Sequence, residues 1–237
     1  MRKGILKLSR EYALKLTGFE KNYKVLEIFF LCENMQVFLL RHGETTGDVE
    51  KRYGGDYDDS LSPKGKKQAV ELAKKITEFE ITKLFVSPKK RAIETGEIIG
   101  KELKLNLIPV QDLRERNQYG VLTGMKKDLA KKEYPDEVMD LEENNPYHHV
   151  KDSEDYFAFC ERVLAAFNEI IEEESEAETD SIAFITHGGP ITVIFREILG
   201  FEIRGIKDCA IFELEYDGEG FEIISADDVD SIEAGLK

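Results

Sequence analysis

The 237-residue sequence has no tryptophan, only three cysteines and no long apolar run. Apolar segments such as residues 28–31 fall far short of the roughly 20 residues that cross a bilayer, which excludes a membrane span. Cys32, Cys160 and Cys209 are odd in number and widely spaced, which argues against a disulfide framework and a cysteine zinc site. We therefore expect a cytoplasmic protein with no membrane partner.

Basic residues are also scarce, because 33 Lys and Arg stand against 48 Asp and Glu, for a formal net charge of −15. A surface of that sign repels nucleic acid unless basic residues gather locally, so we expect no nucleic-acid partner. An anionic substrate would need a small positive site. The oligomeric state is left open.

Three short apolar segments predict buried strands. Residues 37–40, 84–86 and 182–185 are unbroken apolar runs that end at Arg41, Ser87 and Thr186. Runs of this length, bounded by polar turn residues, are typical of strands buried on both faces. A further pair of segments, 210–216 and 221–224, predicts a hairpin with a glycine-bearing turn.

Helical patterns lie between these strands. Ser62 and Pro63 form a helix start signal, and Ser87 with Pro88 repeats it. The expected buried stripes are Ala69, Val70, Leu72, Ala73 and Ile76; Ala92, Ile93, Ile98 and Ile99; and Cys160, Val163, Leu164, Phe167 and Ile171. Alternating strands and helices predict an α/β fold with three layers, a mainly parallel sheet flanked by helices.

One domain is expected over residues 35–237. The polar region 126–151 predicts short helices and loops over the sheet edge. The acidic stretch at Asp227, Asp228 and Asp230 predicts a solvated end. Residues 1–34 stand apart as an N-terminal extension. Their sequence leaves open an added strand, a docking segment or an artefact of start-site choice, since Met35 directly precedes the first core strand.

Two of the four histidines, His42 and His187, fall at the ends of predicted strands, and each is followed by a glycine. Ligands of open α/β sheets bind beyond the carboxyl ends of the strands, and glycine lets the backbone approach a ligand closely. Arg41 adjoins His42, and Arg91 lies in the first turn of a predicted helix, so both could bind phosphate or carboxylate oxygens. His148 and His149 are neighbours in a polar loop without a third ligand, so we expect no metal site.

Five ordered segments resemble the histidine phosphatase superfamily, the phosphoglycerate mutase-like enzymes. They are Arg41-His42-Gly43-Glu44-Thr45; Asp59-Ser60-Leu61-Ser62 with Gly65, Gln68 and Ala69; Ser87-Pro88 with Arg91, Ala92 and Thr95; Leu113-Arg114-Glu115-Arg116 with Gly120 and Gly124; and Thr186-His187-Gly188-Gly189. The match runs over about residues 35 to 200 in the order of the family.

The resemblance implies a phosphatase that needs no metal or other cofactor and acts on a small phosphomonoester. His42 would become a phosphohistidine, since a neutral imidazole is a good nucleophile near pH 7. Arg41, Arg91 and His187, with the backbone at Gly188, would hold the phosphoryl oxygens. Glu115 would be the general acid, because the charge of a nearby phosphate disfavours its ionised form.

The sequence departs from the family pattern at two places. Asp48 stands among the expected phosphate-binding residues where the family usually has asparagine, and a carboxylate there repels phosphate unless it is protonated, paired or turned away. Ser153-Glu154-Asp155 replaces the common Gly-Glu-Ser. Both departures bear on substrate recognition.

Two alternatives stay open. A phosphoglycerate mutase would use the same phosphohistidine and return the phosphoryl group to a bound acceptor, although the segment between Gly124 and Ser153 is short for that activity. A catalytically silent phosphate-binding regulatory module is the other, and the presence of all the expected catalytic residues argues against it. Fold alone does not name the substrate.

Overall fold

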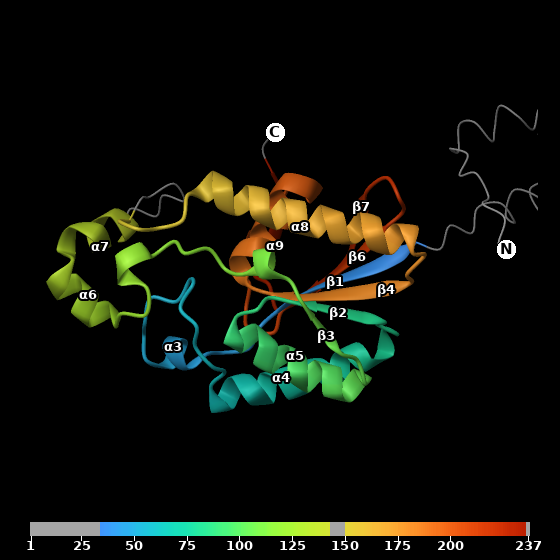
Figure 1. Cartoon of the computed structure of the whole chain (residues 1–237), viewed down its shortest axis with the longest axis horizontal. Helices are drawn as coiled ribbons and strands as arrows, with labels where there is room; N and C mark the ends of the chain where they lie inside the picture. Colours follow the sequence, from blue (N-terminus) through green and yellow to red (C-terminus); the bar gives the residue numbers. More distant parts are fainter. Residues whose placement is uncertain (1–33, 143–149, 236–237) are drawn as a thin grey trace, which may run out of the picture. The chain divides into compact units, whose positions relative to one another are not determined.

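The computed structural model describes residues 34–142 and 150–235, and these described residues form one compact unit (Figure 1). The strands are β1 (Met35–Arg41), β2 (Lys83–Val86), β3 (Leu107–Pro109), β4 (Ser181–Thr186), β5 (Phe201–Arg204), β6 (Ile211–Tyr216), β7 (Phe221–Asp227) and β8 (Ser231–Ala234). The α-helices are α3 (Thr46–Val49), α4 (Pro63–Lys75), α5 (Lys90–Leu103), α6 (Lys127–Glu133), α7 (Pro135–Glu142), α8 (Tyr156–Glu176) and α9 (Gly188–Ile194).

The main sheet has six strands in the order β3-β2-β4-β1-β6-β7. The first four strands in that order are parallel, and β6 and β7 are antiparallel additions at one side. The mainly parallel sheet predicted from the sequence is therefore confirmed, and the hairpin is formed by β6 and β7. The sheet places the carboxyl ends of β1, β2 and β4 along one edge.

Helices cover both faces of this sheet, with α8 on one side and α4 and α5 on the other (Figure 1). Side chains along β1 alternate between the two faces: Val37 and Leu39 pack with α8 and α9, whereas Phe38 and Leu40 pack with α4 and α5. This two-residue period is that of a strand buried on both sides. The predicted three-layer α/β fold is confirmed.

Helix α4 begins as predicted. The Ser62 hydroxyl accepts a hydrogen bond from the Gly65 N–H (3.0 Å), and Pro63 is the first helical residue. Val70 was predicted to face the core, but its side chain is 43% exposed because it points away from the stripe of Ala69, Leu72 and Ala73. The prediction for Val70 is therefore wrong.

Helix α5 begins later than the Ser87-Pro88 signal predicts. Its first residue is Lys90, and Lys89 precedes it without a capping side chain. The Ser87 hydroxyl instead lies 2.7 Å from Nε2 of His187, so it is directed toward the edge of the sheet. The helix start was wrong by two residues, while the placement of Arg91 in the first turn holds.

The acidic side chains of Asp227, Asp228 and Asp230 are exposed to solvent, as the sequence predicts, but the stretch also forms strands. Asp227 ends β7 and lies 2.6 Å from Nζ of Lys75, and β8 follows, paired antiparallel with β5. Short helices α6 and α7 are present in the polar region, where Ala130 and Val138 form a small separate cluster with Tyr53. No helix in the described ranges is long and apolar enough to cross a membrane.

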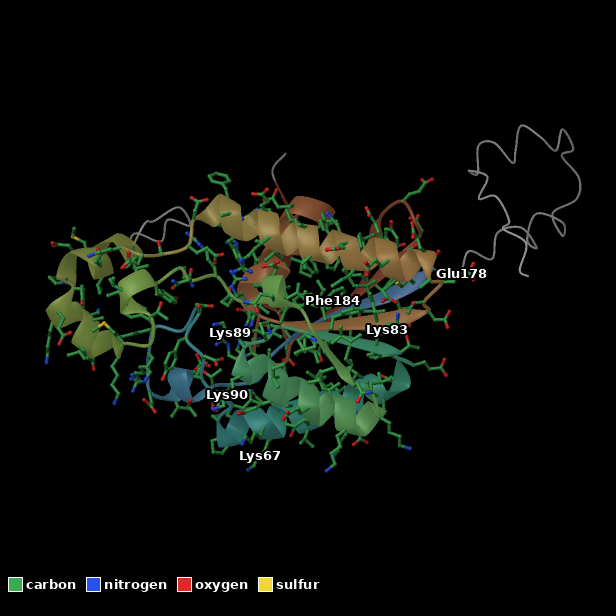
Figure 2. All side chains as sticks on the ribbon, viewed as in Figure 1. Lys67, Lys83, Lys89, Lys90, Glu178 and Phe184 are labelled. Atoms are coloured by element: carbon green, nitrogen blue, oxygen red, sulfur yellow. The ribbon has the colours of Figure 1, made fainter. Side chains whose placement is uncertain are left out.

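The α8 side of the sheet is a packed aromatic core. Phe167 of α8 is fully buried, and its ring centroid lies 5.1 Å from that of Phe184 on β4 and 5.6 Å from that of Phe221 on β7. Phe184 lies beneath α8 in Figure 2. These contacts fix α8 against the strand that carries His187 at its end.

Replacing Phe167 with alanine removes most of these contacts and leaves a cavity. We expect the free energy of unfolding to fall by about 3–5 kcal/mol, measured by urea denaturation. Val70→Ala, at an exposed position of α4, is the matched control and should change that free energy by less than about 0.5 kcal/mol. Equal effects of the two substitutions would contradict the layer assignment.

Candidate active site

Three polar side chains come together where the parallel strands end. His42 directly follows β1, Ser87 follows β2 and His187 follows β4. The registers Arg41↔Thr186 and Val86↔Ile185 bring these strand ends to one level of the sheet. This is the edge at which open α/β sheets bind ligands.

The guanidinium of Arg91 lies between the two imidazoles. Its Nε–H donates to Nε2 of His42 (3.1 Å) and to Nδ1 of His187 (3.2 Å). The two rings face each other edge to face, with centroids 5.0 Å apart. His42, Arg91 and His187 are 5%, 4% and 0% exposed, so this cluster is almost fully removed from water.

The hydrogen bonds define the proton positions on both rings. Nδ1 of His42 lies 2.8 Å from the carbonyl of Gly43, which can only accept, so this nitrogen carries the proton and Nε2 has the lone pair. His187 accepts from Arg91 through Nδ1, which leaves the proton on Nε2, where it is donated to the Ser87 hydroxyl. Both histidines are therefore neutral in this arrangement.

The electrostatics of the cluster lead to the same conclusion. Burial lowers the pKa of His42 well below 6.5, and the charges of Arg91 and Arg41 lower it further, while the Gly43 hydrogen bond opposes them. Burial also lowers the pKa of His187, followed by the effects of Arg91, His42 and Arg41. A neutral imidazole keeps an unprotonated nitrogen that can act as a nucleophile, and in His42 that nitrogen is Nε2, which accepts from Arg91.

The distal nitrogens of Arg91 are held by a loop between α3 and α4. Nη1 donates to the carbonyl of Tyr57 (2.6 Å) and to the carboxylate of Asp59 (3.0 Å), and Nη2 donates to the carbonyl of Gly55 (2.7 Å). Asp59 is buried with Arg91, so the two charges compensate each other. This loop fixes which edge of the guanidinium faces the histidines.

Arg41 supplies a second cation at the same edge. Its Nη2 lies 3.2 Å from the carboxylate of Asp208, and its Nη1 donates to the carbonyl of Ile206. Among the described residues, the buried Nε–H of Arg41 has no acceptor. Buried donors normally have partners, so this N–H marks a position where an anionic oxygen would be bound.

Glu115 lies beside the turn that carries His187. Its Oε2 accepts from the backbone N–H of Gly189 (3.0 Å), and its Oε1 accepts from that of Arg116 (2.9 Å). A Cβ on residue 189 would lie 2.0 Å from Oε1 of Glu115, so only glycine admits the carboxylate there. Gly188 is the first residue of α9, where helix N–H groups lack intrahelical partners.

Two glycines allow the His42 loop to lie against α4. A Cβ on Gly65 would be 2.0 Å from the carbonyl oxygen of Glu44, and one on Gly43 would be 2.7 Å from that of Gly65. The Glu44 carboxylate also accepts from the Ser62 hydroxyl (2.6 Å), the side chain that caps α4. The glycines and acid of the first two motifs therefore have a packing role, which supports the loop that carries His42.

Asp48 is turned toward its own helix. It is the third residue of α3, and its Oδ2 accepts from the backbone N–H (2.9 Å) and the hydroxyl (2.8 Å) of Thr45. The Thr45 hydroxyl in turn accepts from the Asp48 N–H, which completes a capping box. Of the three cases considered for this carboxylate, namely protonated, paired or turned away from phosphate, the structure shows it bound to the donors of Thr45. A contact between Asp48 and phosphate stays a prediction.

The second departure from the family pattern has a similar structural explanation. Asp155 caps α8, since its Oδ1 accepts from the N–H groups of Phe157 and Ala158 (both 2.9 Å). It therefore does the work that a serine hydroxyl would do at this position. His148 and His149 lie outside the described residues. Within the described ranges, no three His, Cys, Asp or Glu side chains cluster as metal ligands.

Sequence reasoning overlooked two side chains at the site. Ser87 was assigned to a helix start, although its place at the end of a buried strand, like that of His42 and His187, was a usable signal. Lys89 precedes α5, and its ammonium lowers the pKa of His187 after the larger effects of burial, Arg91, His42 and Arg41. Its Nζ lies 2.7 Å from the carboxylate of Asp56, and Figure 2 labels Lys89 near the start of α5.

The comparisons with known proteins identify the family. The model of the histidine phosphatase superfamily (branch 1) matches residues 37–229, so the chain belongs to this superfamily of enzymes. The resemblance seen in the five sequence segments is thus confirmed.

Two relatives show how far the similarity extends. The chain is 29% identical over 164 residues to a Bacillus subtilis (strain 168) protein named uncharacterized phosphatase PhoE, covering 69% of this chain and 77% of the relative. It is 26% identical over 210 residues to the probable phosphoglycerate mutase GpmB of Cronobacter sakazakii, covering 84% and 96%. Phosphatase and mutase names thus both occur among its relatives.

Solved structures share the fold. YhfR of Bacillus stearothermophilus superposes with a TM-score of 0.72 at 23% identity, covering 86% of this chain and 98% of that one. A mycobacterial glucosyl-3-phosphoglycerate phosphatase gives 0.68 at 20% identity, covering 81% and 97%. At these identities the likeness concerns the fold alone.

The lowered pKa of His42 predicts a pH-dependent stability. Between its folded pKa and the unfolded value near 6.5, the unfolded chain binds a proton that the folded protein does not, so the free energy of unfolding falls as the pH drops below about 6.5. His42→Gln removes that proton, so its stability should fall less steeply, by up to about 1.4 kcal/mol per pH unit. The measurement is urea denaturation from about pH 7.5 to about 4.5 in phosphate-free buffer, a range that extends below the unfolded pKa.

Lys67→Gln, at an exposed position of α4, is the control and should give a curve parallel to that of the unchanged protein. If the His42→Gln curve is also parallel, the buried neutral state of His42 is wrong.

Proposed function

We propose that this enzyme hydrolyses a small phosphomonoester through a phosphohistidine on Nε2 of His42. The observation that carries the proposal is the neutral imidazole of His42, with its Nδ1–H donated to Gly43 and its Nε2 lone pair facing Arg91. The family membership supports the same chemistry. The relative named as a phosphatase supports hydrolysis.

In the first step, Nε2 of His42 attacks phosphorus in line. The N–P bond forms as the bond from phosphorus to the leaving oxygen breaks, and the imidazole becomes positively charged. The Gly43 carbonyl stabilises that charge because it already accepts from Nδ1. A bound phosphate would replace the imidazoles as the acceptor of the Arg91 Nε–H, since an anionic oxygen accepts more strongly than a neutral ring.

The phosphoryl oxygens need further donors. Arg41 offers a buried Nε–H without an acceptor among the described residues, and His187 carries a proton on Nε2. The first N–H of α9, at Gly188, adds one donor that directly follows His187 in the chain. The site thus gathers hydrogen-bond donors, two of them arginines, within a protein of net charge −15.

Glu115 acts as the general acid and then as the general base. As a carboxylic acid it would protonate the leaving alkoxide, and as a carboxylate it would then take a proton from the water that attacks phosphorus. The second attack breaks the N–P bond and returns the electron pair to Nε2 of His42. The Gly189 and Arg116 N–H groups keep the carboxyl oriented through both steps.

The cytoplasmic location expected from the sequence is part of this proposal. The two described cysteines, Cys160 and Cys209, are buried and free, as in proteins of reducing compartments.

Trapping the intermediate tests the nucleophile. With 4-nitrophenyl phosphate and a chelator present throughout, we expect a mass increase of one phosphoryl group on a peptide containing His42 after alkaline quenching, together with steady phosphate release. His42→Ala should abolish both, whereas Lys67→Gln should retain both. Phosphate release by His42→Ala at the rate of the unchanged enzyme would refute the proposed mechanism. So would a loss of phosphate release by the unchanged enzyme when the chelator is added.

A mutase is the second candidate, because the GpmB relative bears that name and covers most of the chain. Incubation with 3-phosphoglycerate and a bisphosphoglycerate primer separates the two activities. We expect free phosphate to be the main product, if any of the substrate reacts. Rapid isomerisation with little free phosphate would establish the mutase instead.

A further inference from the structure

The carboxyl group of Glu115 is carried by irregular backbone rather than by a strand. The segment follows a single 3-10 turn (Gln111–Leu113), and residue 115 has no helix or strand assignment. His42 and His187, by contrast, directly follow hydrogen-bonded strands. Loop backbone moves more freely than strand ends, so the position of Glu115 must come from other contacts.

Arg162 of α8 supplies those contacts from behind the segment. Its Nη1 donates to the carbonyl of Asp112 (2.7 Å) and to that of Arg114 (2.9 Å), and its Nη2 donates to the carbonyl of Glu115 itself (3.2 Å). One guanidinium therefore holds three backbone carbonyls of the acid-bearing segment.

Glu154 orients this guanidinium. Its Oε1 accepts from Nε of Arg162 (2.7 Å) and its Oε2 accepts from Nη2 (3.0 Å), which is the bidentate geometry of a strong pair. Glu154 also holds the far side of the segment, since its Oε2 accepts from the N–H of Asn117 (3.1 Å) and its own N–H donates to the carbonyl of Asn117 (2.8 Å). The pair thus brackets Glu115 on both sides.

The pair is shielded from water. The side chains of Arg162 and Glu154 are 12% and 18% exposed. Burial alone raises the pKa of Glu154, but the hydrogen bond and charge of Arg162 outweigh it and leave this pKa below its usual value. The guanidinium of Arg162 also lies over the Phe159 ring, 4.9 Å from its centroid.

We propose that Glu154 and Arg162 are positioning residues that hold Glu115 at the distance and angle needed for proton transfer to the leaving group. This inference rests on the proposed function, because it assumes that Glu115 is the general acid. Neither residue touches the phosphoryl group in this assignment. Their effect acts through the backbone of the segment that carries Glu115.

The proposal predicts an effect that depends on the leaving group. 4-Nitrophenolate leaves readily as an anion and needs no proton, whereas the alkoxide of glycerol phosphate does need one. A misplaced acid therefore slows the alkyl substrate and spares the aryl one. A merely destabilised protein would lose activity on both substrates equally.

The experiment compares kcat/KM for the two phosphate esters, because this constant reports the steps through departure of the leaving group. Glu115→Gln should lose about 10²-fold or more on glycerol phosphate and much less on 4-nitrophenyl phosphate. Arg162→Met should show the same selective loss, by about 10-fold or more. Glu115→Gln combined with Arg162→Met should lose no more than Glu115→Gln alone, since the two residues act in one step.

Two further variants guard against misfolding. Arg162→Lys keeps the charge but lacks the forked geometry, so it should fold and still show part of the selective loss. Lys83→Met is the matched control, because Lys83 forms an ion pair with Glu174 near the other end of α8. Lys83 begins β2, at the opposite end from Lys89 (Figure 2). Its loss should lower the melting temperature and change both kcat/KM values by the same factor.

The outcomes separate the two proposals. If Glu115→Gln slows both esters equally, Glu115 is not the general acid, and the positioning role falls with it. If Glu115→Gln is selective but folded Arg162→Met and Arg162→Lys are not, the proposed function stands and the positioning role is wrong. Losses that add in the double variant would also overturn the positioning role.

Discussion

The site depends on one buried cation placed between two neutral rings. Arg91 donates a single N–H to both His42 and His187, and burial together with the Arg91 charge lowers the pKa of both rings. A guanidinium with so little access to water requires compensation, which Asp59 and two backbone carbonyls provide. The loop before α4 is therefore part of the same electrostatic unit as the strand ends.

The large negative charge of the protein does not prevent anion binding at this edge of the sheet, because the donors and their counter-charges are arranged locally. Arg41 is paired with Asp208 on its Nη2 side, yet its Nε–H is left unpaired among the described residues. Acidic groups far from the site are screened over about 10 Å in salt, whereas buried charges within it interact at short range and low dielectric. Net charge therefore does not decide whether the site binds an anion.

The sequence predicts the strand ends better than the contacts between loops. Parallel topology obliges residues that follow β1 and β4 to meet, so His42 and His187 could be placed from their apolar runs alone. The Ser87-Pro88 pair is compatible with a helix cap and with the end of a strand. Local sequence does not decide between the two, because the Ser87 hydroxyl pairs with His187, which is 100 residues away in the chain. The capping box between Thr45 and Asp48 was not predicted either, because the family pattern places a phosphate-binding residue at position 48.

A site built from strand ends and loops needs two kinds of support. The sheet ladder fixes the backbone beside His42 and His187, and Gly43 and Gly189 then let neighbouring groups approach that backbone closely. Glu115 has no such ladder, and the backbone hydrogen bonds that a strand would make are replaced by the guanidinium of Arg162, which is itself oriented by Glu154. In the proposed mechanism Glu115 is the general acid and must lie within hydrogen-bond reach of the leaving oxygen, so the proposal makes proton transfer depend on these side-chain contacts.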